Sequence, residues 1–156
     1  MKDTTSKKLR RSRHLARHLT ELGRLLHKEV RTEDLLSLDE TEALLARSKA
    51  VTRRAPDWKS SFPFAEKEQR LSRPIRPIHA EMVYVWTALA NDCGVHRLVR
   101  LSELDFRFSF DFSPEGILTV ISEDLENQML LDWHKDNGVE LLDLEVTGPR
   151  WSAAGP

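Results

Sequence analysis

The chain has 156 residues, one cysteine and a formal net charge of −1. This length suits one domain, or a small domain with an appendage. A single cysteine excludes an intramolecular disulfide and a multi-cysteine zinc site. The sequence shows no apolar run long enough to cross a bilayer and no apolar segment after the N-terminal charges, so we expect a soluble, cytoplasmic protein without a membrane span.

Charge is divided unevenly along the chain. Residues 1–78 contain 19 Lys and Arg against 11 Asp and Glu, a net charge of +8, whereas residues 79–156 contain 5 against 14, a net charge of −9. This asymmetry predicts that at least one half binds an oppositely charged partner: nucleic acid, a membrane surface or a protein. The alternative is that the two halves neutralise each other, within one molecule or between subunits.

Residues 1–51 are predicted to form a basic helical hairpin arm, an αα-hairpin. The first helix covers about residues 9–30, because its apolar residues recur at helical spacing on one stripe. These residues are Leu15, Leu19, Leu22, Leu26 and Val30. Ser37 or Asp39 can cap the second helix, which has acidic residues in its first turn and basic residues in its last.

Residues 52–77 contain four prolines and no sustained period, so they are predicted to be an extended, Pro-containing linker. Pro77 then suits the first turn of a helix over about residues 78–92, whose apolar residues return at helical spacing. Gly94 fits the end of that helix.

The remaining sequence predicts four consecutive antiparallel strands, near residues 105–112, 117–122, 128–134 and 139–147. In the first hairpin, a turn at residues 113–116 places Phe112 opposite Leu118 and Phe110 opposite Val120.

In the second hairpin, Asn137-Gly138 indicates a type I′ turn, which places Trp133 opposite Leu142 and Asp132 opposite Asp143. The predicted fold is therefore α+β: the hairpin arm, the linker, and a module at residues 78–151 with one helix packed on a four-stranded antiparallel sheet.

The sheet face away from the predicted core is acidic. Its polar candidates are Asp111, Asp132, His134, Asp143 and Glu145. Carboxylates directly opposite each other in a ladder are destabilising unless something compensates. A metal ion, a basic partner or an internal arginine could each do so.

We favour a basic protein surface as the partner, which makes the protein a non-enzymatic interaction protein. In charge and β content alone, the C-terminal half resembles small acidic binding proteins such as the immunity proteins that neutralise toxins. A more remote possibility is a metal-dependent hydrolase that uses Asp111, Asp132 and Asp143.

The basic N-terminus supports an alternative function. Residues 1–31 hold ten Lys and Arg against three acidic residues. Such a field suits phosphate contacts, and predicts a nucleic-acid-associated accessory protein. The contacting residues would be Lys7, Lys8, Arg10, Arg11, Arg13 and Arg17.

Motifs for catalysis are incomplete. His79-Ala80-Glu81 matches the start of the zinc deaminase signature, but Cys93 is the single cysteine and a ligand is missing. His14 and His18 are four residues apart, yet no third ligand accompanies them. We therefore expect neither an enzyme nor a cofactor or bound metal.

Overall fold

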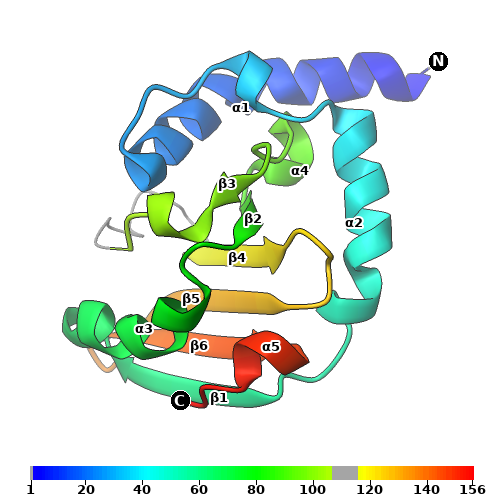
Figure 1. Cartoon of the computed structure of the whole chain (residues 1–156). Helices are drawn as coiled ribbons and strands as arrows, with labels where there is room; N and C mark the ends of the chain where they lie inside the picture. The colour runs from blue at the N-terminus through cyan, green and yellow to red at the C-terminus, as the bar shows by residue number, and fades with distance from the viewer. Residues whose placement is uncertain (1, 107–115) are drawn as a thin grey trace.

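The structure is a computed structural model that describes residues 2–106 and 116–156. Its centre is a six-stranded antiparallel sheet in the order β1-β6-β5-β4-β2-β3 (Figure 1). The strands are Trp58–Pro63 (β1), Met82–Thr87 (β2), Val99–Arg100 (β3), Ile117–Ser122 (β4), Gln128–Asp136 (β5) and Val139–Thr147 (β6). The α-helices are Lys2–Leu26 (α1), Leu38–Thr52 (α2), Lys67–Ile75 (α3), Ala90–Cys93 (α4) and Pro149–Ser152 (α5). The α+β class is confirmed, whereas the prediction of four strands and one covering helix is wrong.

The two N-terminal helices are confirmed, but they do not lie against each other as a hairpin. In Figure 1, α1 runs across the top of the molecule and α2 runs down its side, and both contact α4. The start of α2 follows the predicted cap: the Glu40 N–H donates to the Ser37 hydroxyl at 3.1 Å, and the Ser37 N–H donates to the Glu40 carboxylate at 2.8 Å. Gly94 ends α4 with φ +102, and a Cβ there would lie 2.3 Å from the Leu36 carbonyl oxygen. The prediction that Gly94 stops a helix is therefore correct, although that helix is short.

The predicted helix over residues 78–92 is wrong, because its central residues form β2. Val83 and Val85 lie in the large apolar cluster on one sheet face, while Tyr84 and Trp86 join a second cluster on the other. A strand buried on both faces reads as a continuous apolar run, which also fits helical spacing. The run Met82–Thr87, rich in β-branched and aromatic residues, favoured a strand.

Residues 52–77 are not an extended linker, since they contain β1 and α3. β1 pairs with β6 at the edge of the sheet, where Pro63 ends the strand. Proline is tolerated at such an edge because no ladder hydrogen bond on the free side needs its missing N–H. The division of the chain into an arm, a linker and a module stays a prediction, but one part of the middle segment, β1, belongs to the sheet.

The predicted first hairpin does not have its expected place in the sheet. Residues 107–115 lie outside the described residues, and with them most of the predicted strand at 105–112. β4 pairs with β2 along one edge and with β5 along the other, so Val120 lies opposite Val85 and Met129. The expected pairing of Val120 with Phe110, and of Leu118 with Phe112, is therefore wrong.

The β5–β6 hairpin is confirmed in full register. Trp133 lies opposite Leu142, and Asp132 lies opposite Asp143. Asn137 and Gly138 have φ values of +50 and +79, as a type I′ turn requires. This register fixes which side chains share the acidic face.

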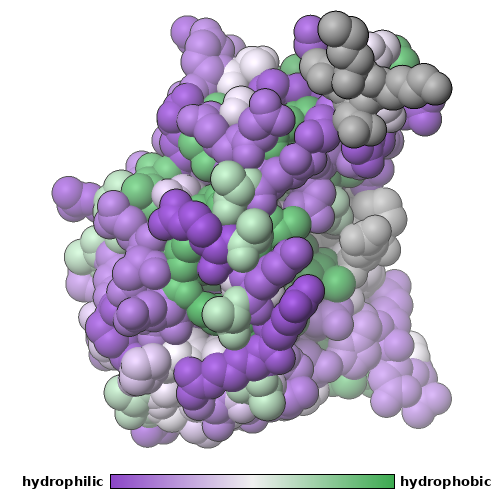
Figure 2. All heavy atoms as spheres, turned by 90° about the vertical axis from the view of Figure 1, so that its right-hand side faces the viewer, coloured by the Kyte–Doolittle hydropathy of each residue, from purple (hydrophilic) through white to green (hydrophobic). Residues whose placement is uncertain are grey.

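Apolar side chains form clusters on both sides of the sheet. The larger one joins α1, α3 and α5 to one face, with Leu22, Leu71 and Trp151 all at most 2% exposed. The smaller one joins α2 and α4 to part of the other face, through Leu44 and Ala90. Figure 2, which looks onto the side of the molecule that carries α2, shows a mostly hydrophilic surface with apolar side chains around a central hollow. The rest of this second face, over β1, β6 and the turn end of β5, presents exposed residues on β1 and half-exposed residues on β5 and β6.

Candidate functional site

The acidic sheet face lies on β5, β6 and β1. Asp132 and Asp143 are direct cross-strand neighbours, and Leu130 lies opposite Glu145. The side chains of Asp143 and Glu145 are 42% and 32% exposed. The sheet therefore brings together four of the five predicted residues, while Asp111 lies outside the described residues.

One cation, Lys59, and one histidine, His134, lie beside the carboxylates of this face. The Lys59 ammonium of β1 lies 2.7 Å from the Glu145 carboxylate, and His134 Nδ1 lies 3.7 Å from an Asp143 oxygen. Lys59 was missed from sequence because its strand was assigned to a linker. An internal cation was one of the three expected compensations, and the structure supplies a lysine from β1 and a histidine from β5 where an arginine was expected.

The Asp132 carboxylate remains in an unfavourable electrostatic environment. Partial burial raises the pKa of Asp132, and the neighbouring Asp143 and Glu145 carboxylates raise it further, against the opposing effect of His134. The ionised form of Asp132 is therefore disfavoured in the free protein. A cation of a partner placed beside Asp132 would stabilise this ionised form.

A shallow cleft of about 430 Å³ opens on this face along β1, β6 and the end of β5. Its charged residues are Lys59, Asp136, Asp143 and Glu145, with His134 beside them. Leu141 adds apolar surface to the cleft and Ser61 a hydroxyl. With Asp132 included, the face carries four carboxylates and one lysine, a composition that suits a cationic ligand with some apolar surface. We call this face the acidic cleft; its residues are Lys59, Ser61, Asp132, His134, Asp136, Leu141, Asp143 and Glu145.

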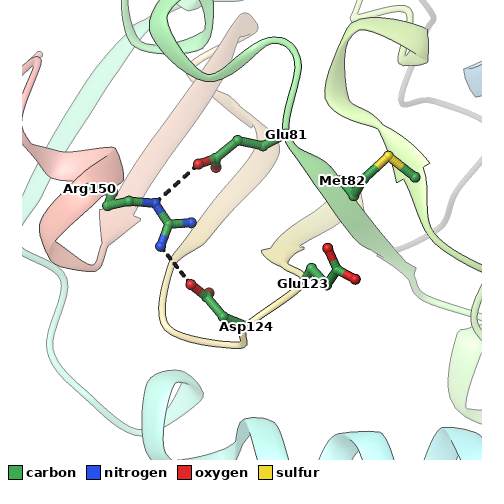
Figure 3. A pocket seen from close by; sticks show the side chains of 5 residues that line it. All are labelled: Glu81, Met82, Glu123, Asp124 and Arg150. Carbon is green, nitrogen blue, oxygen red and sulfur yellow. Dashed lines mark hydrogen bonds and ion pairs between the residues drawn. The ribbon is translucent and has the colours of Figure 1, made fainter.

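A second pocket, of about 390 Å³, surrounds Arg150 (Figure 3). Arg150 Nε donates to Glu81 at 3.1 Å, and its Nη1 donates to Asp124 at 2.6 Å. Figure 3 shows the guanidinium lying between these two carboxylates, with Glu123 and Met82 across the pocket. The contacts join α5 to the start of β2 and to the β4–β5 turn, which are far apart in sequence.

The β4–β5 turn is held by its own hydrogen bonds. The Ser122 hydroxyl donates to Asp124 at 2.6 Å, and together with Arg150 it lowers the pKa of Asp124 to about 2. The Asn127 side-chain oxygen accepts from the backbone N–H groups of Arg150 and Trp151 at 3.1 and 3.2 Å. Asp124 and Glu81 are thus engaged in fixing α5, which explains the pocket as a structural ion-pair network. Sequence reasoning missed it because the partners are 26 and 69 residues apart.

The basic residues of α1 divide into two groups. Lys7 faces the body of the protein, where its ammonium lies 2.8 Å from Glu42 and 3.7 Å from Asp39 at the start of α2. Arg11 is half-buried. The other predicted phosphate-contacting residues, Lys8, Arg10, Arg13 and Arg17, are exposed.

The remaining candidates for chemistry have structural roles. His18 is fully buried, and its Nε2–H donates to the Gly94 carbonyl at 2.8 Å; burial lowers the pKa of its imidazole to about 4. Cys93 is buried, which raises the pKa of its thiol to about 11. Glu81, the last residue of the His79-Ala80-Glu81 stretch, forms an ion pair with Arg150. Within residues 2–106 and 116–156, no three metal-ligating side chains gather in one place.

No family model, curated protein or solved structure matches this chain significantly. Among the described helices, none is both long and apolar enough to cross a membrane.

Proposed function

We propose that the protein is a non-enzymatic interaction protein whose acidic cleft binds a cationic segment of a partner protein. The observation that carries this proposal is the cross-strand pairing of Asp132 with Asp143 on an open sheet face. Like charges in this position reduce the stability of the free protein, and a cationic partner would remove that cost on binding.

The composition of the acidic cleft supports a peptide-like ligand. A segment that alternates basic and apolar residues could place its cations beside Asp132, Asp136 and Asp143 while its apolar residues contact Leu130 and Leu141. Charge complementarity of this kind increases association rates and selects against acidic partners.

The test is a binding measurement with an arginine-rich peptide that contains apolar residues, by fluorescence anisotropy over a salt series. The variant replaces the four carboxylates of the face by amides: Asp132→Asn, Asp136→Asn, Asp143→Asn and Glu145→Gln. We expect its affinity to fall by tenfold or more, about 1.4 kcal/mol.

A control variant with the same change of charge separates local from general electrostatics. It carries Gln at four exposed glutamates elsewhere: Glu29, Glu33, Glu123 and Glu126. An equal loss of affinity in both variants, or no binding by the natural chain at low salt, would refute the proposal. Co-purification from the native host, with mass spectrometry of proteins that the cleft variant loses and the control retains, would then identify the partner.

A further inference from the structure

Four arginines form a stripe along the outward side of α1. They are Arg10, Arg13, Arg17 and Arg24, all exposed. Because successive helical residues are rotated by about 100°, these four fall within an arc of about 60°. At about 1.5 Å per residue they extend over roughly 21 Å of the helix. We call them the arginine stripe.

The orientation of α1 separates the stripe from the cations that the protein neutralises itself. Lys7 points to α2 and Arg11 to the interior, as described above. Between residues 5 and 26, all of them described, the exposed charged side chains of α1 are cationic, and the single carboxylate, Glu21, is 4% exposed.

Three members of the stripe, Arg10, Arg17 and Arg24, have acidic neighbours but remain exposed. Arg10 lies 3.5 Å from Asp92 and is 57% exposed, and Arg17 lies 3.4 Å from Glu21 and is 45% exposed. The stripe therefore does not depend on unpaired arginines: it is a row of guanidinium groups that present donors to the solvent. The Arg10–Asp92 pair lies at the surface, and such pairs are weak and exchange readily for a stronger anion. Glu21, the partner of Arg17, is buried, so Arg17 binds a phosphate with the donors that it presents to the solvent.

We propose that the arginine stripe is a docking surface for the phosphate backbone of duplex nucleic acid. Guanidinium groups donate two parallel hydrogen bonds to phosphate oxygens, and neutralised phosphates release counterions. A straight row on a rigid helix fits the regular phosphates of a duplex strand. This assignment omits Lys7 and Arg11, omits Lys8 because it lies about 160° around the helix from Arg10, and adds Arg24. It uses a surface separate from the acidic cleft.

The structure favours a duplex over a single strand or a membrane. Proteins that bind single strands use aromatic side chains on which bases stack, and α1 contains no Phe, Tyr or Trp. Helices that bind membranes insert an apolar face. The C-terminal part of the apolar face of α1 is already buried in the core, with Leu22 and Leu25 at 0% and 1% exposure, and Leu9 is the exposed leucine of this helix.

The test measures binding of the full chain to a short DNA duplex and a short RNA duplex of random sequence. Four phosphate contacts predict that affinity falls by about 100-fold between roughly 50 and 200 mM salt. Changing all four stripe arginines to Gln should abolish most of this salt dependence, lowering the slope by about 3 to 4. Changing them to Lys should preserve the slope, because the charge remains.

The matched control changes four other exposed arginines to Gln: Arg47, Arg53, Arg73 and Arg76. It should keep the natural slope, and circular dichroism confirms that each variant is folded. Arg13→Gln alone serves as a milder variant and should lower the slope by about one.

Three results would overturn the proposal. The first is no affinity of the natural chain for either duplex at low salt. The second is a loss of salt dependence in the control as large as in the stripe variant. The third is tighter binding to vesicles of phosphatidylcholine and phosphatidylserine than to the duplexes. Failure of peptide binding at the acidic cleft would leave these outcomes unchanged, because neither variant alters that cleft.

Discussion

The helical region, residues 2–52, and the sheet present opposite charges at their surfaces but share their apolar core. Arginines dominate the outward side of α1, while carboxylates dominate the open face of β5 and β6. Leu22 and Leu25 of α1 nevertheless lie in the same buried cluster as Val83 and Val120 of the sheet. Charge along the sequence therefore marks surfaces in this protein, while both regions contribute side chains to one buried cluster.

The two regions also differ in how their charges are compensated. Cations of the helices meet carboxylates from other elements, as the inward-facing Lys7 meets Glu42 and the exposed Arg10 meets Asp92. On the sheet, Asp132 and Asp143 face each other, with Lys59 and His134 as partial compensation. The sheet face is therefore where an outside partner would change stability most.

The largest effect should come from separating the two regions. We expect the fragment of residues 79–151 to show no cooperative thermal transition, because it lacks the α1 side chains that cover the sheet and lacks the edge strand β1. Circular dichroism during heating measures this directly.

Mixing residues 1–54 with residues 55–156 is the control for this experiment. It should restore a cooperative transition if the shared core drives association. A cooperative transition in the isolated fragment of residues 79–151 would instead show that the helical region is an independent arm, as the charge profile suggests.

A single core substitution should have the next largest effect. Leu22→Ala removes a fully buried side chain from the contact between α1 and the sheet, and should lower the free energy of unfolding by about 2–5 kcal/mol. Leu9→Ala, at a position that is 64% exposed on the same helix, should change it by less than about 0.5 kcal/mol. Denaturant unfolding of both variants compares them, and similar values would mean that α1 does not contribute to the core.

The pH dependence should be intermediate and centred on His18, at the contact of α1 with α4. Burial lowers the pKa of His18 to about 4, below the ordinary value of 6.5. As pH falls through 6.5, His18 is protonated in the unfolded chain but stays neutral in the folded chain, so the free energy of unfolding decreases until pH approaches 4. Between pH 7 and pH 5 the loss from this residue should be about 2 kcal/mol.

His18→Gln isolates that contribution, because His96, whose pKa is also lowered by burial, remains in both proteins. The free energy of unfolding should fall less steeply from pH 7 to pH 5 in His18→Gln than in the natural chain. Parallel pH profiles would show that His18 accepts a proton in the folded state.

The sequence predicted the parts of the molecule that depend on local signals. The β5–β6 register follows from the turn at Asn137-Gly138 and from strict alternation, so the meeting of Asp132 and Asp143 could be foreseen. Ser37 likewise marked the start of α2. The acidic face was thus predictable from one hairpin.

Contacts between distant segments could not be foreseen. Lys59 reaches Glu145 because residues 58–63 form an edge strand. The strand was not recognised because residues 52–77 contain four prolines and show no sustained period. β2 was mistaken for a helix because it is buried on both faces. The Arg150 network needed the positions of α5, β2 and the β4–β5 turn together, which no local pattern contains.

The smallest expected effect concerns the acidic face itself. Asp132→Thr should raise the free energy of unfolding at pH 7 by about 0.2–1 kcal/mol, because it removes a carboxylate that faces Asp143 and places a β-branched residue in a strand. The gain should shrink as pH falls through the raised pKa of Asp132, since protonation relieves the same repulsion in the natural chain. Glu145→Gln, which breaks the ion pair with Lys59, should instead lower stability slightly, by about 0–1 kcal/mol. Denaturant unfolding of the two variants at pH 7 and pH 4 gives opposite signs if the face is compensated at Glu145 and uncompensated at Asp132. A loss of stability in Asp132→Thr would mean that this carboxylate already has a stabilising partner, and the acidic cleft would lose the physical reason to bind a cationic protein.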